Sequence, residues 1–254
     1  KTGAERLEAY LSYLRGKNIG IVANQTTIIG KNNLVDSLYS LKLNIKRILC
    51  PEHGLRGEAE AGEIIQDSVD AKTGIPIVSI YTVSKKPTPK DLEGLDIVIF
   101  DIQDVGTRFF TNISHLHYVM ESCAENNVEV MILDRPNPHG FYVDGPPVLD
   151  SAYRSFVGMH SVPVVHGMTI GEYAMMINGE GWLNKKIKCR LKVITCESYT
   201  HDSLYSLPVK PSPNLPNMTA IYLYPSICFF EGTVFSLGRG TEFPFQVYGH
   251  PSLK

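Results

Sequence analysis

The sequence predicts an α/β fold, in which a parallel sheet carries helices on both faces, followed by a smaller α+β segment. Three observations favour this fold. Short apolar runs rich in β-branched residues alternate with stretches of helical periodicity, as in βαβ units. The runs are only strand-sized and nearly continuous in their hydrophobicity, which is typical of strands buried on both faces. Polar clusters follow four of these runs, and with 254 residues and 43% hydrophobic residues the chain can form a substantial core.

The predicted elements follow one another in regular order. The first helix is expected within residues 4–15, where apolar side chains recur at helical spacing until Gly16. A later helix is expected to begin after Thr88, because threonine is a favoured N-cap and proline at the next position is suited to a first turn. Further helices are predicted at 34–41, 112–126 and from Thr169 to about 179, and strands at 18–23, 45–50, 76–81, 95–100 and 128–133.

The character of the chain changes after Gly140, where proline and glycine become frequent. Short strands are expected at residues 191–194 and 220–223. We interpret residues 1–184 as a Rossmann-like α/β domain and residues 185–254 as the start of a smaller α+β domain. That second domain is expected to be truncated, because its last ten residues resemble the middle of a domain rather than a closing helix.

Composition and motifs exclude several classes of function. The formal net charge is −2, and no long run of Lys or Arg is present, so nucleic acid is not an expected partner. No apolar stretch approaches the roughly 20 residues of a membrane span. The five cysteines are widely spaced and form no CxxC, which favours free thiols over a zinc site or disulfides. Neither G-x-G-x-x-G nor a P-loop occurs, and no cofactor is expected.

Four predicted strands end in polar clusters. These are residues 24–27, Glu52 with His53, residues 101–104 and residues 134–137. Ligands bind outside the carboxyl ends of the strands in such sheets, so the clusters are expected to meet at one edge. The substrate-binding residues predicted there are Asn24, Asp101, Gln103, Asp104, Arg135 and Asn137.

Glu52 is the candidate catalytic group. A carboxylate that follows a strand beside His53, Asp101 and Asp104 has like-charged neighbours and partial burial, and both raise its pKa toward the range of a general acid. Alternatively, Glu52 caps a helix or pairs with Arg56.

Other residues have competing interpretations. Asp101 and Asp104 could hold Mg²⁺ or Ca²⁺ through oxygen atoms, although no other part of the chain shows metal-ligand spacing. Asn137 could instead form a turn with its own backbone. Thr169 and Glu172 have the spacing of a capping box, so Glu172 is not counted as catalytic.

Longer motifs occur in a fixed order through the chain. They are Pro51-Glu-His-Gly-Leu-Arg-Gly57, Asp101-Ile-Gln-Asp-Val-Gly-Thr-Arg-Phe109, Leu133-Asp-Arg-Pro-Asn-Pro138, Ser155-Phe-Val-Gly158, His166-Gly-Met-Thr-Ile-Gly-Glu172, Pro211-Ser-Pro-Asn-Leu-Pro216, Phe230-Glu-Gly-Thr233 and Ser236-Leu-Gly-Arg-Gly-Thr-Glu-Phe-Pro-Phe245. In these motifs the chain resembles the DUF1343 family, whose characterised members are exo-β-N-acetylmuramidases of the NamZ type. The resemblance implies a Rossmann-like domain, a smaller C-terminal domain and a site in the cleft between them.

The resemblance also implies roles for individual residues. The family's Pro-Glu-His-Gly glutamate corresponds to Glu52, expected to be the general acid with His53 as its neighbour, and the Phe-Glu-Gly-Thr glutamate corresponds to Glu231, a candidate nucleophile or base. Alternatively, the substrate's own acetamido group attacks. His166 is expected to contact substrate, and Arg239 or Arg135 to hold the lactyl carboxylate of muramic acid.

The implied substrate is a muropeptide or disaccharide derived from peptidoglycan, and the implied location is the cell envelope, periplasmic or secreted. Two departures from the family pattern stand in the C-terminal part, Leu237 where glutamate is expected and Ser226 where glycine is usual. Two other functions stay open from the sequence. One is a non-catalytic protein that binds muropeptides or sugars, and the other is a metal-dependent hydrolase that uses Asp101 and Asp104.

Overall fold

A seven-stranded sheet forms the centre of the protein. The computed structural model describes residues 1–51, 55, 68–81, 84–147 and 150–252. The strand order is β5-β6-β4-β1-β7-β8-β9, and every neighbouring pair is parallel except β5 with β6. In chain order the strands are β1 Ile19–Ala23, β4 Ile45–Cys50, β5 Ser68–Val69, β6 Pro76–Ser79, β7 Ile97–Asp101, β8 Glu129–Leu133 and β9 Leu191–Ile194, with β2 Ile28–Ile29 and β3 Asn32–Asn33 as a separate hairpin.

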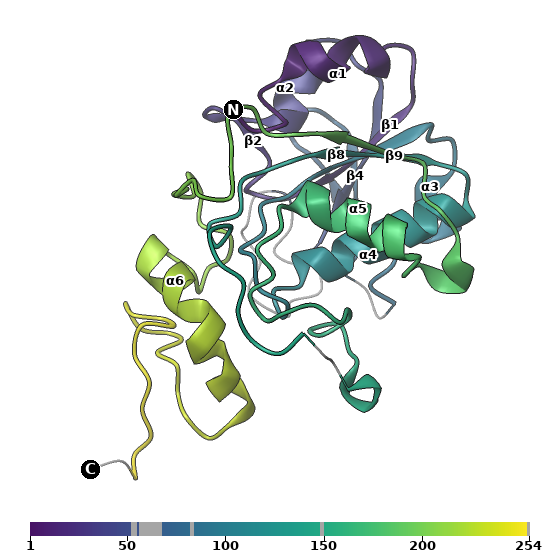
Figure 1. Cartoon of the computed structure of the whole chain (residues 1–254). Helices are drawn as coiled ribbons and strands as arrows, with labels where there is room; N and C mark the ends of the chain where they lie inside the picture. The colour runs from purple at the N-terminus through teal and green to yellow at the C-terminus, as the bar shows by residue number, and fades with distance from the viewer. Residues whose placement is uncertain (52–54, 56–67, 82–83, 148–149, 253–254) are drawn as a thin grey trace.

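Helices cover both faces of this sheet (Figure 1). On one face lie α1 (Leu7–Leu14) and α2 (Leu34–Ser40). On the other lie α3 (Pro89–Leu92), α4 (Asn112–Glu125) and α5 (Ile170–Glu180). The predicted α/β fold is therefore confirmed, and so is Thr88 as the N-cap of α3. No helix in the described part of the chain is both long and apolar enough to cross a membrane.

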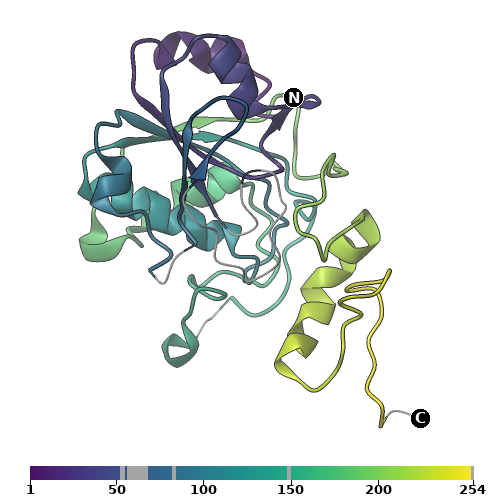
Figure 2. The same ribbon diagram turned by 180° about the vertical axis from the view of Figure 1, so that it is seen from behind.

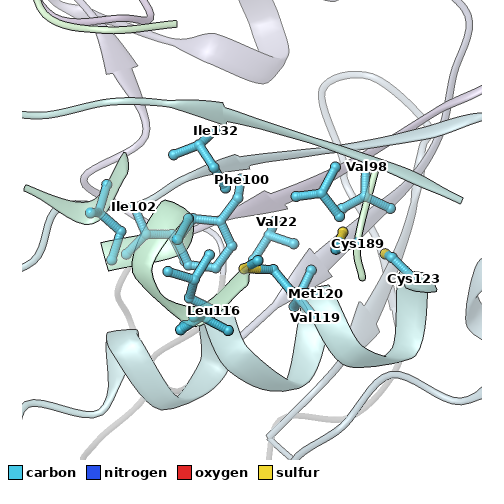
Figure 3. Packing of buried hydrophobic residues seen from close by; sticks show 14 of the residues in the cluster. Val22, Val98, Phe100, Ile102, Leu116, Val119, Met120, Cys123, Ile132 and Cys189 are labelled. Carbon is cyan, nitrogen blue, oxygen red and sulfur yellow. The ribbon is translucent and has the colours of Figure 1, made fainter. Parts of the chain in front are cut away.

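The strands bury alternate side chains on opposite faces, as their two-residue period requires. In β1, Ile19 and Ile21 pack with Tyr10 of α1 and Leu38 of α2. Val22 points the other way and joins the cluster built on α4 and α5. Figure 3 shows this second cluster, in which sheet residues meet one face of α4; its labelled members include Phe100, Ile132, Leu116, Val119 and Met120. Helices cover both faces of the sheet and exclude water from them, which explains why the strands are apolar throughout.

Strand β1 lies at the point where the order of the sheet reverses. The chain passes from β1 to β4 on one side, and later returns to place β7 on the other side of β1. In sheets of this kind a ligand site is expected outside the carboxyl ends of the strands at such a point, here β1 and β7. Asn24 directly follows β1, and Asp101 is the last residue of β7.

The residues from about Leu215 onward, here called the C-terminal part, lie beside the sheet and its helices, here called the α/β part, in both views (Figures 1 and 2). The C-terminal part contains α6 (Met218–Ile227) and the 3₁₀ turn Cys228–Gly232. Its apolar residues, among them Leu215, Tyr224 and Phe245, form a third cluster with Val105 of the α/β part. The two parts thus share a small core of their own.

Two predictions about the second half of the chain have different outcomes. The strand expected at residues 220–223 is wrong, since these residues lie in α6, where the Asn217 side chain caps the helix by accepting from the Ala220 amide (2.9 Å). The strand at 191–194 is confirmed as β9, which pairs in parallel with β8. Residues beyond 185 therefore still contribute to the main sheet, and the division at 184/185 stays a prediction.

Candidate active site

The loop after β1 is tied to the loop after β7 by hydroxyl groups. Asn24 Oδ1 accepts from the amide and the hydroxyl of Thr26 (2.8 and 2.6 Å). The Thr26 hydroxyl in turn accepts from the Gln103 amide (3.0 Å), and the Thr27 hydroxyl donates to the Asp101 carbonyl. All of these side chains are buried. Short polar residues after β1 therefore hold the loops after β1 and β7 together at this edge of the sheet.

A buried ion pair joins the loops after β7 and β8. Arg135 Nε and Nη2 donate to the two carboxylate oxygens of Asp101 at 2.6 and 2.8 Å, and Nη2 also donates to the Ile28 carbonyl (2.9 Å). Burial disfavours the charge of the guanidinium, but the Asp101 carboxylate outweighs it and raises the pKa of Arg135. Both side chains are almost fully buried. Both carboxylate oxygens of Asp101 and two nitrogens of Arg135 are engaged within the protein, which favours a positioning role over the substrate contact predicted for them.

Two buried amides complete the connections between loops. Gln103 Nε2 donates to the carbonyls of Asp104 and Pro136, both at 2.8 Å. Asn137 Nδ2 donates to the Met168 carbonyl (2.9 Å), and its Oδ1 accepts from the His139 amide (2.8 Å). Gln103 Oε1 is buried and has no partner among the described residues. Gln103 and Asn137 thus lie where the sequence predicts, but most of their bonding capacity is used within the protein.

Asp104 and His166 form a buried polar pair in the α/β part. Asp104 Oδ2 accepts from the Gly106 amide (2.7 Å) and lies 3.7 Å from His166 Nε2. His166 Nδ1 accepts from the Met168 amide (3.2 Å), so its proton is on Nε2, toward the carboxylate. Asp104 Oδ1 and His166 Nε2 have no hydrogen-bond partner within the described part of the chain. Both atoms are buried, and neither residue borders the cavities described below.

Asp134 anchors the amino end of α5. Its carboxylate accepts from the Gly171 amide (2.8 Å), the Thr169 hydroxyl (2.9 Å) and the Arg135 amide (3.0 Å). Burial raises the pKa of Asp134 to about 6, although these donors act against the shift. The Thr169 and Glu172 capping box is present as predicted. Glu172 thus has the structural role that the sequence favoured.

A cavity of about 180 Å³ lies between the α/β part and the C-terminal part. Asn24 and Asn112 border it from the first part, and Tyr224, Glu231 and Arg239 from the second. Glu231 and Arg239 form an ion pair whose side chains are 36% and 45% exposed. Three predicted site residues, distant in sequence, therefore share one cavity.

The aromatic lining of this cavity was not predicted as part of the site. Phe109, Phe110, Tyr224 and Phe245 all border it, and Phe109 packs edge-on against Tyr224 with ring centroids 5.3 Å apart. The signal was present in the Asp101–Phe109 motif, but the sequence does not show which aromatic residue of the second part faces it. Asn112, whose Nδ2 donates to the Gln103 carbonyl (2.9 Å), was missed in the same way.

A larger cavity, of about 520 Å³, lies between the N-terminal residues and residues 197–208. Of the predicted site residues that the structure describes, only Arg135 borders it, and its guanidinium is already engaged by Asp101. The smaller cavity is therefore the better candidate for the active site.

The two residues predicted to act as general acid and its neighbour, Glu52 and His53, lie outside the described residues. They follow Cys50 and Pro51, at the carboxyl end of β4. Because β4 is the neighbour of β1, β4 ends at the same edge of the sheet that carries Asn24. Their predicted roles stay predictions.

The metal alternative required Asp101 as a ligand. Both of its carboxylate oxygens accept from Arg135, so a metal ion there would have to displace a buried guanidinium. The described residues contain no group of three His, Cys, Asp or Glu side chains placed to hold a metal ion. The geometry at Asp101 argues against this alternative.

Comparison with known proteins gives a consistent result. Residues 19–219 match the N-terminal domain, and residues 222–254 the C-terminal domain, of the family described as exo-beta-N-acetylmuramidase NamZ. The chain is 41% identical to the peptidoglycan beta-N-acetylmuramidase NamZ of Bacillus subtilis over 262 aligned positions, which cover all of this chain and 62% of that protein. The chain thus spans less than two thirds of the length of this curated relative.

Two crystal structures of DUF1343 family proteins from Bacteroides fragilis resemble the whole chain. One is 50% identical with a TM-score of 0.91, and the chain covers 67% of it. The other is 34% identical with a TM-score of 0.89, and the chain covers 66% of it.

Proposed function

The chain belongs to the NamZ exo-β-N-acetylmuramidase family, and we propose that it is a glycoside hydrolase that releases N-acetylmuramic acid from the non-reducing ends of peptidoglycan fragments. The observation that carries this proposal is the 41% identity to a peptidoglycan beta-N-acetylmuramidase along the full length of this chain. The cavity between the two parts supports it, because polar residues from both converge there. Such a substrate implies that the protein acts in the cell envelope, in the periplasm or after secretion.

Glu52 is the proposed general acid. Glycoside cleavage requires a proton on the leaving oxygen and a group that meets the oxocarbenium-like carbon. Its motif matches the family's Pro-Glu-His-Gly sequence, and it follows β4, the strand that pairs with β1. The adjacent His53 is proposed to adjust its proton affinity.

The second group comes either from the protein or from the substrate. Glu231 borders the cavity and could serve as nucleophile or base, but its carboxylate is paired with Arg239. In the other mechanism the substrate's acetamido oxygen attacks, and Asp104 orients it by accepting from the acetamido N–H. This mechanism requires Asp104 Oδ1, which is buried and has no partner among the described residues, to become accessible to the substrate.

Arg239 is the better of the two candidates for the lactyl carboxylate. The guanidinium of Arg135 is buried and held by Asp101, whereas that of Arg239 is half-exposed at the cavity. A planar guanidinium can bind two carboxylates through different N–H groups, so Arg239 can contact Glu231 and substrate together.

The test is the hydrolysis of a chromogenic aryl N-acetyl-β-muramide. Replacing Glu52 by glutamine removes the proton donor and is expected to lower kcat by about 10²–10⁴-fold. Glu180→Gln, an exposed change at the end of α5, serves as the matched control and should keep full activity. Near-normal hydrolysis by Glu52→Gln would rule out the assignment of Glu52. Saturable sugar binding without turnover by the unmodified protein would instead favour a binding protein.

A further inference from the structure

A further cavity, of about 400 Å³, lies next to the candidate active site and is distinct from the 520 Å³ cavity. It is called the second cavity below. The loop of residues 155–158 separates the two, since Val157 borders the first cavity while Ser155 and Phe156 border the second. This loop is the Ser-Phe-Val-Gly motif, which the proposed catalytic mechanism does not use. It is closed by two hydrogen bonds between the backbones of Ser155 and Gly158 and by the Ser114 hydroxyl, which donates to the Phe156 carbonyl (2.6 Å).

Helix α4 connects the two cavities. Asn112 at its start borders the first, and His117, Tyr118 and Glu121 border the second. At 1.5 Å and 100° per residue, these positions lie about 8–14 Å along the helix from Asn112 and about 120–180° around its axis. A few linked sugar rings can cover such a span.

Aromatic side chains form much of the wall of the second cavity. The rings of Tyr118 and Phe156 are nearly parallel, at 8° with centroids 6.1 Å apart. Trp182 borders the cavity and stacks on His160 (4.7 Å, 21°). Stacking covers one face of each of these rings, and Lys85 Nζ lies 4.9 Å from the centroid of Phe156. The aromatic faces that stay uncovered can contact the apolar C–H faces of a sugar ring.

The acidic group in this cavity is already neutralised. Glu121 accepts from Lys86 Nζ (2.8 Å) through one oxygen and from the Asn184 amide (2.6 Å) through the other. His117 Nε2 also lies 3.5 Å from this carboxylate. The oxygens of Glu121 are therefore occupied by donors from the protein.

Arg154 is the cation left for a ligand. Its side chain is exposed at the cavity, and it makes no hydrogen bond or ion pair with any residue that the structure describes. The nearby His117 and His160 are hydrogen-bonded to each other (Nδ1 to Nε2, 2.9 Å). Burial lowers the pKa of both, so near neutral pH these rings carry no charge that could compete for an anion.

We propose that the second cavity binds a carboxylate-bearing amino sugar of the glycan on the leaving-group side of the cleaved bond. This inference rests on the proposed function. The aromatic walls contact the sugar ring, and the Arg154 guanidinium binds the carboxylate through paired N–H groups. The enzyme thereby recognises a longer glycan beyond the sugar that it releases.

The fluorescence of Trp182 tests binding directly, because it is the only tryptophan of the chain and it borders the cavity. Titration with N-acetylmuramic acid is expected to change the emission in a saturable way. N-acetylglucosamine, which lacks the carboxylate, should bind at least about tenfold more weakly, as loss of one charge-assisted contact predicts. Arg154→Gln should remove this preference, and Arg154→Lys should keep part of it. Equal responses to the two sugars in the unmodified protein would overturn the proposal.

Kinetics provide the second test. Arg154→Gln is expected to raise KM for peptide-free glycan chains about tenfold and to leave the aryl muramide, which has no sugar on the leaving side, unaffected. Arg15→Gln, an equal loss of charge next to α1 on the other face of the sheet, is the control and should change neither. Equal effects of Arg154→Gln on both substrates, or on neither, would overturn the inference. Failure of the unmodified protein to cleave the aryl muramide would instead contradict the proposed function, and the fluorescence titration would still test the cavity.

Discussion

At the scale of single residues, the ion pair between Asp101 and Arg135 connects three loops. It joins the ends of β7 and β8, and through the Ile28 carbonyl it also holds the hairpin that follows β1. A buried ion pair is costly to desolvate, so its value lies in the geometry that it fixes rather than in net stability. Loss of one partner leaves the other charge buried without compensation.

The first prediction concerns this pair. Arg135→Leu is expected to lower the free energy of unfolding by about 3–5 kcal/mol at pH 7, because Asp101 stays buried without its partner. Burial already raises the pKa of Asp101, and loss of the guanidinium raises it further. The folded variant then binds a proton that the unfolded chain does not, so its stability falls as pH rises, and the deficit should be smaller near pH 4 than at pH 7.

Urea unfolding at the two pH values measures this effect. The control is Lys72→Met, which breaks the more exposed ion pair with Asp36 and should cost no more than about 1 kcal/mol. If the Arg135 variant loses no more stability than this control, the pair does not have the structural role assigned to it.

Residue identities at the strand ends were predictable from the sequence, but their partners were not. The positions of Asn24, Asp101 and Arg135 after apolar runs indicated that they lie at one edge of the sheet. Whether Arg135 binds a substrate or a neighbouring carboxylate depends on distances of a few ångströms between loops 34 residues apart. Spacing in the sequence carries no such distances.

At the scale of elements, the amino end of α5 shows how a cap connects a helix to the site. Thr169 accepts from the Glu172 amide, as in any capping box, and also donates to Asp134 at 2.9 Å. Asp134 lies between Leu133, the last residue of β8, and Arg135. The cap therefore fixes the helix and the site loop to each other.

The second prediction compares two caps. Thr169→Ala is expected to lower the free energy of unfolding by about 2–3 kcal/mol, from loss of the cap and of the bond to buried Asp134. Thr88→Ala, at the exposed capping box of the four-residue helix α3, removes only a cap and should cost about 1 kcal/mol or less. Thermal or urea unfolding gives both values, and equal losses would show that the contact with Asp134 adds nothing.

At the scale of elements, the predicted cap at Thr169 is correct, whereas the strand predicted at residues 220–223 is wrong. The cap at Thr169 was predicted because both of its residues are close in sequence. Residues 220–223 were predicted as a strand because Ile221 and Tyr222 have high β-propensity. Their helix begins instead at the Asn217 cap and packs Ile221 and Tyr224 into the cluster with Val105, a contact that local propensity does not include.

At the scale of the whole molecule, aromatic packing holds the C-terminal part against the α/β part. Phe109 contacts Tyr224 and Phe229 edge-on, with centroids 5.3 and 5.5 Å apart. Phe110 contacts Tyr224 as well (5.9 Å). Gln25 adds polar contacts to the carbonyls of Lys210 and Pro211 in the connecting segment. The cavity between the parts depends on these contacts.

The third prediction is that Phe109→Ala loosens this attachment. Without the ring, the C-terminal part loses two of its edge-on contacts, each about 0.5–1.5 kcal/mol beyond simple burial. Limited proteolysis within residues 197–217 should accelerate several-fold, and hydrolysis of the aryl muramide should fall. Phe141→Ala, at an exposed phenylalanine, is the control. Unchanged cleavage of this segment in the Phe109 variant would contradict the role given to that ring.

The sheet itself was largely predictable, because strands buried on both faces must be apolar and helices between them must be amphipathic. The order of the strands was not, and neither was the antiparallel pairing of β5 at the edge. Strand β5 has two residues, Ser68 and Val69, too few to produce a pattern. Convergence of Glu231 and Arg239 with Asn24 followed from the resemblance, since packing between distant segments has no local signal.

The central position of β1 has a consequence for folding. One neighbour of β1 in the sheet, β4, follows it closely in the sequence. The other neighbour, β7, begins 78 positions after β1, at Ile97 against Ile19. Closing so long a loop lowers the entropy of the chain before the contacts between the strands can stabilise the pair. This pairing is therefore expected to form late and slowly. During synthesis, the hydrogen bonds that join the loops after β1 and β7 cannot form until β7 has left the ribosome. The candidate active site is thus among the last features of the α/β part to form.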